Sequence, residues 1–257
     1  MAMATKFEIV SEKKIEFNIP LLRGVRGVLF VLGVFMSVVS TAQNSGLLEN
    51  LKLTADDTRH ERFDRIAVDF YANRFLNAPT NITQGDFSFG VSTYWYKDIP
   101  LGKKSRVAIA FGAGFSSYSI HHNGRFNLVD SLGINDFVAF EKLPDSIKFY
   151  KNKISFNYVD VPFELRFRNM DGKNKIRFYP GFKIGILVND HTKWRDQNIK
   201  LKVYDLPNTL IYQYGPTLRL AWNKIAIHGY YALTPVFQKN KGTQTSLVSL
   251  GISWIRF

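Results

Sequence analysis

The sequence has no cysteine, which excludes disulfide bonds, thiolate metal sites, iron–sulfur clusters and cysteine nucleophiles. It also lacks a long apolar run: the longest, residues 27–39, is too short to cross a hydrocarbon core of roughly 30 Å as a helix. Hydrophobic residues nevertheless make up 46% of the 257 residues and aromatic residues 15%, so disordered and fibrous classes are excluded. The aromatic content comes mainly from 22 Phe and 12 Tyr.

The apolar run of residues 27–39 has the layout of a signal peptide. Arg23 and Arg26 precede it, and the small residues Ser40 and Ala42 follow it, as the A-x-A-like cleavage rule requires. A buried core helix is the alternative, but no amphipathic stripe interrupts the run. We expect residues 1–42 to be an N-terminal extension and signal peptide cleaved near Ala42, and residues 43–61 to be a short periplasmic segment.

The chain is strongly basic, with a formal net charge of +13 and a pI near 9.8. Residues 1–42 hold five basic and three acidic side chains, so +11 belongs to the exported part. Its Lys and Arg residues are scattered, and no nucleic-acid-binding motif accompanies them. We therefore expect no nucleic-acid partner and consider an anionic membrane or polysaccharide the more suitable neighbour.

Alternation of apolar with small or polar residues recurs throughout the exported chain. About eight runs show it: residues 62–75, 86–97, 106–118, 153–168, 176–188, 210–222, 224–233 and 245–257. In the fourth run the apolar parity changes after Tyr158, which predicts a β-bulge near residues 158–160. The pattern predicts an all-β fold over residues 62–257, without helical spans.

The connections between these runs alternate in length. Residues 98–105, 169–175 and 222–224 form short links, whereas residues 76–85, 119–152, 189–209 and 234–244 form long polar ones. In an antiparallel up-and-down order all long links fall at one end, as in outer-membrane barrels with short periplasmic turns. We therefore expect a transmembrane β-barrel of about eight strands.

Period two alone does not decide which face lies inside. A soluble lipocalin-like barrel holds its large apolar residues inside, whereas a narrow membrane barrel fills its lumen with small and hydrogen-bonded polar side chains. Here the polar face carries Gly112, Gly114, Gly181 and Gly215 beside tyrosines. This favours a lipid-facing apolar side and leaves the soluble ligand-binding barrel as the weaker alternative.

Charged residues of both signs lie on the expected lumen face: Asp69, Glu164, Arg166, Lys183, Arg219 and His228. Opposite charges in a narrow lumen pair with one another, and eight strands leave room only for side chains. We expect a polar network that closes the barrel rather than a diffusion pore.

No motif assigns catalytic, cofactor-binding or metal-binding residues, so we expect no cofactor and no enzymatic activity. The histidines His121, His122 and His191 lack the spacing of metal ligands. An outer-leaflet lipid A acyl hydrolase or acyltransferase is the alternative; it requires His121, His122 or His228 near a Ser and a carboxylate at the rim.

Two loops are candidate contact surfaces. Residues 119–152 contain more apolar residues than a solvated loop needs, so they either pack on the barrel as a hairpin or bind a partner. In the second loop Trp194 stands between Lys193 and Arg195, which suggests contact with lipopolysaccharide phosphate or a partner protein.

Two segments resemble known outer-membrane proteins. The ending LGISWIRF, residues 250–257, resembles the last strand of Gram-negative outer-membrane proteins, whose final Phe, here Phe257, is read by the barrel-assembly machinery. The segment NYVDVPFELRF, residues 157–167, is similar to a strand of small Bacteroidota barrels called PorT-like. The resemblance implies an outer-membrane protein that contacts lipopolysaccharide and envelope or secretion-system proteins, with a structural or interaction role as an accessory of type IX secretion or gliding.

Overall fold

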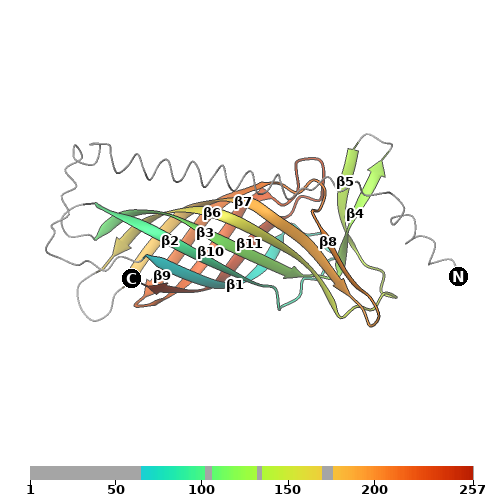
Figure 1. Ribbon diagram of the computed structural model, residues 1–257, viewed down its shortest axis with the longest axis horizontal. Helices are drawn as coiled ribbons and strands as arrows, with labels where there is room; N and C mark the ends of the chain where they lie inside the picture. Colours follow the sequence, from blue (N-terminus) through green and yellow to red (C-terminus); the bar gives the residue numbers. More distant parts are fainter. Residues whose placement is uncertain (1–64, 102–105, 132–134, 170–175, 257) are drawn as a thin grey trace.

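The computed structural model describes residues 65–101, 106–131, 135–169 and 176–256, whose regular secondary structure consists of β-strands joined by turns and loops (Figure 1). The strands are β1 (Ile66–Leu76), β2 (Phe89–Leu101), β3 (Val107–His121), β4 (Gly124–Ser131), β5 (Asn135–Lys142), β6 (Lys151–Arg168), β7 (Ile176–Arg195), β8 (Lys200–Tyr204), β9 (Tyr212–Trp222), β10 (Ile225–Pro235) and β11 (Ser246–Arg256). The described part contains no helix long and apolar enough to cross a bilayer. The expected signal peptide, the segment 43–61 and Phe257 lie outside the described residues.

Eight of the strands close into an antiparallel barrel. Their order is β6-β3-β2-β1-β11-β10-β9-β7, and a further pairing of β6 with β7 joins the two edges. All eight runs expected from the alternation are present, so the predicted eight-stranded fold is confirmed. Closure matters because an open sheet edge would leave backbone N–H and C=O groups unpaired in lipid.

The connections also follow the expected alternation. Strands β2, β6 and β9 end, and β3, β7 and β10 begin, at the end of the barrel where β1 begins and β11 finishes, which we call the turn end. The link from β9 to β10 has only two residues, and its Asn223 has φ of 54°, a left-handed conformation that Asn tolerates. At the opposite, loop end Figure 1 shows β4, β5 and β8.

Large apolar side chains point out of the barrel. Phe70, Trp222 and Leu250 are 62%, 64% and 65% exposed, whereas their strand neighbours Asp69, Ala221 and Ser249 are buried. This arrangement suits lipid and is opposite to that of a soluble ligand-binding barrel. The expected lipid-facing side is therefore confirmed.

The interior is polar in the middle of the barrel and apolar at the loop end, and this corrects the expected β-bulge in β6. In β6 the inward residues keep one parity throughout, including Ile154, Phe156, Tyr158 and Asp160. The register does shift beside Tyr158, but the extra residue is Val188 of β7. The change of apolar parity in β6 arises because its loop end has apolar residues inside, whereas its middle has them outside.

Close packing of the lumen explains why one inward position is glycine. An added Cβ at Gly114 would lie 2.3 Å from Tyr94 Cδ1 and 2.3 Å from the Thr93 carbonyl oxygen. The Tyr94 ring therefore lies across the space that a side chain at position 114 would fill. Gly229, in contrast, has nothing nearer than Leu250 Cδ1 at 4.0 Å.

We predict that Gly114→Ala lowers the stability of the refolded barrel by about 1–3 kcal/mol, because the added methyl group overpacks the interior. Gly229→Ala is the matched control and should leave stability unchanged or slightly raised. Urea unfolding in detergent micelles, followed by tryptophan fluorescence, measures both. Equal midpoints for the two variants would contradict this account of the lumen.

Candidate functional site

The centre of the barrel interior is an ion pair network built on Arg219 of β9. Its Nη2 lies 2.9 and 3.1 Å from the two carboxylate oxygens of Asp69 in β1, and its Nη1 donates to Glu164 Oε1 in β6. All three side chains are buried. Because charge-assisted hydrogen bonds are stronger than neutral ones, Arg219 ties together three strands that are far apart in sequence.

The network continues from Glu164 toward the turn end. Arg166 Nε donates to Glu164 Oε2 at 2.9 Å, and its Nη1 donates to Asp98 Oδ1 at 2.5 Å. Arg168 also donates to Asp98. The Arg166 guanidinium lies 4.5 Å from the ring centroid of Tyr96, which adds a cation–π contact to the charge pairing.

A second buried pair lies toward the loop end. Lys183 Nζ is 3.2 Å from Asp160 Oδ2, and the Tyr94 hydroxyl donates to the same oxygen at 2.8 Å. Lys183 also donates to the Tyr118 hydroxyl and lies 3.9 Å from the Tyr230 ring centroid. Lys183 and Asp160 therefore face each other's opposite charge, and Lys183 also faces aromatic side chains.

The six charged residues predicted for the lumen are all buried there. Four of them, Asp69, Glu164, Arg166 and Arg219, belong to one network, whereas Lys183 pairs with a residue outside the prediction. His228 borders the network: its Nε2 is 3.9 Å from Asp69 Oδ2, beyond hydrogen-bonding distance.

Sequence reasoning missed three partners, Asp98, Asp160 and Arg168. It assigned Asp98 to a short connection and Asp160 to the expected bulge. Extending the inward parity of β2 and β6 by a few residues would have identified both.

An apolar plug fills the interior at the loop end. It contains Phe75, Ile120, Ile154, Phe156, Val138, Phe140, Phe237 and Leu247. The β4–β5 hairpin supplies two of these, Val138 and Phe140, and Phe126 stacks on Phe140 at 4.4 Å between ring centroids. Backbone hydrogen bonds of Val138 with Lys241 and Thr243 fasten the hairpin to the β10–β11 loop. Phe126, Val138 and Phe140 thus pack on the barrel, whereas Leu128 and Val129 of the same hairpin stay exposed.

Two of the loop histidines occupy different surroundings. His122 is buried between Phe126 and Phe140, its Nδ1 lies 3.0 Å from the Gly124 carbonyl oxygen, and burial lowers the pKa of His122 to about 4. His121 lies on the outward side of β3. Within the described residues, no group of three or more His, Asp or Glu side chains is arranged to hold a metal ion.

At the loop end of the wall, β7 extends beyond its pairing with β9 and pairs with β8 instead, while β6 stays paired with both β7 and β3. We call the paired residues 151–155, 191–195 and 200–204 of β6, β7 and β8 the ribbon. Lys193 and Arg195 share one face of this ribbon because they are two residues apart. Trp194 lies on the opposite face, level with Asn152 and Leu201. The structure therefore separates Trp194 from the two cations that flank it in sequence.

The inner side of the ribbon has a carboxylate that holds the following loop. Asp190 Oδ2 accepts hydrogen bonds from Leu206 N at 3.2 Å and Thr209 Oγ1 at 3.0 Å. The pKa of Asp190 is raised to about 6, mainly by burial. The two hydrogen bonds act in the opposite direction, and the nearby charge of Asp205 adds to the increase. Asp190 therefore gains a proton in a mildly acidic medium.

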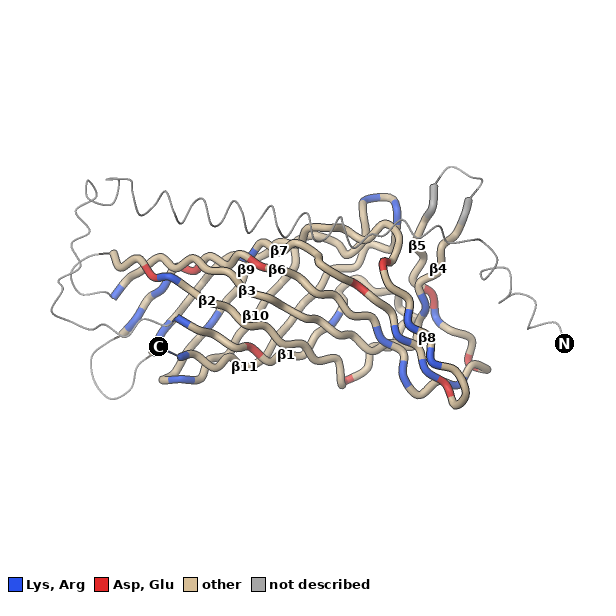
Figure 2. The backbone as a smooth tube through the Cα atoms, in the orientation of Figure 1, with Lys and Arg blue, Asp and Glu red and all other residues tan. Residues whose placement is uncertain are grey.

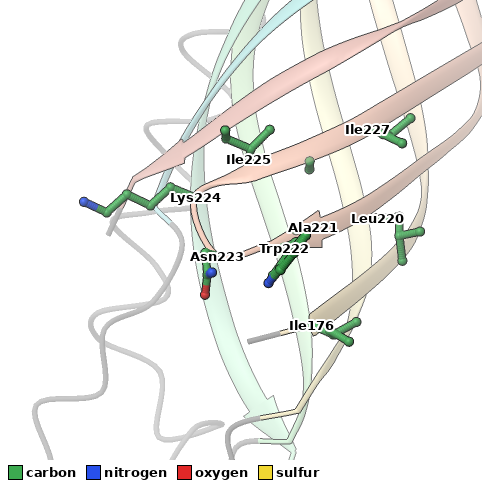
Figure 3. A pocket seen from close by; sticks show the side chains of 9 residues that line it. Ile176, Leu220, Ala221, Trp222, Asn223, Lys224, Ile225 and Ile227 are labelled. Carbon is green, nitrogen blue, oxygen red and sulfur yellow. The ribbon is translucent and has the colours of Figure 1, made fainter. Parts of the chain in front are cut away.

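A shallow apolar hollow lies on the wall at the turn end. Figure 3 shows Ile176, Leu220, Trp222, Ile225 and Ile227 around it, contributed by β7, β9 and β10. These outward side chains belong to the lipid-facing surface. The hollow is therefore part of the barrel wall rather than a separate ligand site.

The family model described as "outer membrane protein beta-barrel domain" matches residues 56–238. This chain belongs to the outer-membrane β-barrel family. No curated protein matches it. Among solved structures it is similar to mutant porins from Rhodopseudomonas blastica. One of these mutants has 9% identity and a TM-score of 0.19, and another, described as a triple mutant, has 8% identity and a TM-score of 0.19. Each alignment covers 74% of this chain and 98% of the porin.

We predict that Arg219→Met lowers the unfolding free energy of this outer-membrane barrel by about 3–5 kcal/mol, because Asp69 and Glu164 lose their shared counter-charge. Arg74→Met is the control, since Arg74 makes only an exposed 3.5 Å pair with Asp86, and should cost less than about 1 kcal/mol. Adding Glu164→Gln to Arg219→Met should recover part of the loss. Urea unfolding checks all three, and equal losses for the two Arg variants would refute the network's role.

We also predict that lowering the pH from 7 to 5 stabilises the loop around residues 205–210. The native pKa of Asp190, about 6, lies above its ordinary value of 3.8, so the native loop binds more protons in this range. Between pH 7 and pH 5 this difference corresponds to at most about 1.4 kcal/mol. Hydrogen exchange of this segment, corrected for intrinsic rates, should slow in the native protein but stay constant in Asp190→Asn. A pH response retained by Asp190→Asn would assign the effect to another group.

Proposed function

We propose that this outer-membrane barrel is a non-conducting protein that acts through its surfaces, as a structural or interaction component of the envelope. The observation that carries the proposal is the filled lumen. Buried ion pairs, which extend from Arg166–Asp98 to Lys183–Asp160 along the axis, fill its middle. The apolar plug fills its loop end. An eight-stranded barrel has room only for side chains, so this filling leaves no path for solutes.

The loop end supports an interaction role. The hairpin β4–β5 uses Phe126 and Phe140 to pack on the barrel but leaves Leu128 48% exposed and Val129 38% exposed. Exposed apolar residues on an anchored hairpin suit a contact with another protein. The resemblance of residues 157–167 to PorT-like barrels of Bacteroidota suggests the partner class, namely envelope proteins of type IX secretion or gliding.

We infer that the protein is not an enzyme. His228 lies within the closed network next to Asp69, His122 is enclosed in the plug, and His121 points outward from the wall. In this arrangement none of the three is placed with a Ser and a carboxylate at the rim, as a lipid-modifying hydrolase requires. The proposal also includes export by a signal peptide cleaved near Ala42 and recognition of Phe257 by the barrel-assembly machinery.

Two measurements on the intact protein test this function. Reconstituted in planar bilayers, the barrel should show no steady conductance; open channels would refute the closed lumen. In a deletion strain, the native gene should restore type IX secretion or gliding. The double variant Leu128→Ser, Val129→Ser, which keeps the packing residues Phe126, Val138 and Phe140, should reach the outer membrane without restoring them.

The control is Leu218→Ala, a change on the lipid-facing wall, which should restore the phenotype fully. A deletion strain that secretes and glides normally would contradict the accessory role. Full restoration by the double variant Leu128→Ser, Val129→Ser would contradict the assignment of that role to the hairpin.

A further inference from the structure

The ribbon formed by residues 151–155, 191–195 and 200–204 carries six Lys and Arg side chains on one face. The pairing places Lys151, Arg195 and Lys200 in one row across the three strands, and Lys153, Lys193 and Lys202 in a second row. We call these six residues the cationic face. Figure 2 shows the basic residues gathered along β8 and the strand ends beside it.

Like charges in register are unfavourable. Directly opposite side chains on neighbouring strands have Cβ atoms about 4.5–5.5 Å apart, and like charges at such positions destabilise a sheet. Lys200, with Lys151 and Lys202, lowers the pKa of Lys193. Burial, followed by Lys151 and Lys193, lowers the pKa of Lys153. The ribbon thus keeps an arrangement that is strained unless negative charge is supplied.

The protein supplies little of that negative charge. Among the residues that the structure describes, no carboxylate forms a salt bridge with any member of the cationic face. The contacts that are present are uncharged: Lys153 Nζ donates to Ser119 Oγ at 2.9 Å, and Lys202 Nζ lies 4.3 Å from the Tyr204 ring centroid. Within the described part of the chain this face is therefore not neutralised by ion pairs, and an external anion can supply the counter-charge.

The position of the face indicates where that charge lies. Lys153 has the outward parity of β6, the same as Val159 and Phe163 on the lipid-facing wall. Moving along this outer side toward the loop end, the apolar residues are followed by Asn157 and Ser155 and then by the cations. The cationic face therefore continues the lipid-facing wall just beyond its apolar part, at the level of lipid headgroups.

We propose that the cationic face binds the phosphate groups of outer-leaflet lipids, in particular a bisphosphorylated glycolipid of the lipid A type. Two parallel rows of cations match a ligand with more than one phosphate, and the apolar wall below them accommodates its acyl chains. The inference uses the outer-membrane location, which the family establishes, and does not depend on the secretion or gliding role.

Binding can be measured with the full barrel in neutral detergent, titrated with bisphosphorylated lipid A and followed by native mass spectrometry. The triple variant Lys153→Gln, Lys193→Gln, Lys202→Gln should bind at least about tenfold more weakly than the native protein. The matched control changes Lys148, Lys239 and Lys241 to Gln, three exposed loop-end lysines off the ribbon, and should bind as the native protein does. Equal binding by the triple variant would overturn the proposal.

Two further probes distinguish the source of the phosphate. Dephosphorylated lipid A should bind the native protein and the triple variant with the same affinity. Soluble polyphosphate should bind the native protein more weakly than lipid A does; equal or tighter binding would assign the face to a soluble polyanion and overturn the lipid assignment.

A second measurement separates binding from misfolding. Without lipid, hydrogen exchange in residues 200–204 should be slower in the triple variant than in the native protein, because repulsion between the rows is relieved. With bisphosphorylated lipid A the order should reverse. Faster exchange in the triple variant under both conditions would mean that the lysines serve the ribbon's own fold, and would refute the proposal.

Discussion

The contact of one guanidinium with two carboxylates holds the barrel interior together. Arg219 reaches Asp69 and Glu164 from a third strand, inside a lumen where water is scarce and an unpaired charge is very unfavourable. Because both carboxylates are buried, Arg219 compensates their charge and links β1, β6 and β9 across the lumen, in addition to the backbone pairing of neighbouring strands. Further pairs, such as Arg166 with Asp98 and Lys183 with Asp160, compensate buried charges in the same way at other levels of the barrel axis.

The interior has two parts, and each suits its surroundings. The membrane-embedded middle is polar and paired, so its rigidity comes from charge geometry and from tyrosine rings such as Tyr94 and Tyr96. The loop end is apolar, and its rigidity comes from packing of Phe140 and Phe237. The hairpin that supplies Phe140 therefore becomes part of the barrel's core, while its other residues remain available at the surface.

Much of this arrangement could be predicted from the sequence because a barrel wall in lipid enforces strict alternation. The parity of the alternation predicted all eight strands, the outward apolar side and the burial of residues such as Arg219. The partners Asp98 and Asp160 were missed because the inward parity was not followed to the end of β2 and through the middle of β6. In β6 the alternation was read as though the lumen were polar throughout, and Ile154 and Phe156 show that it is not. The pairing of β8 and the opposite placement of Trp194 depend on register, which sequence alone does not give.

The extra residue Val188 changes the numbering parity of β7 without changing which side of the ribbon is basic. Before it, the odd-numbered residues of β7, such as Lys183, face the lumen, and after it the odd-numbered residues Lys193 and Arg195 face outward. Because Val188 has no partner in β6, a strand without it would keep Leu187 opposite Tyr158 and Asn189 opposite Asn157, and every later residue would stay on its present side. A one-residue difference in strand length at this point is therefore absorbed by the bulge, and the surface chemistry above the membrane is preserved.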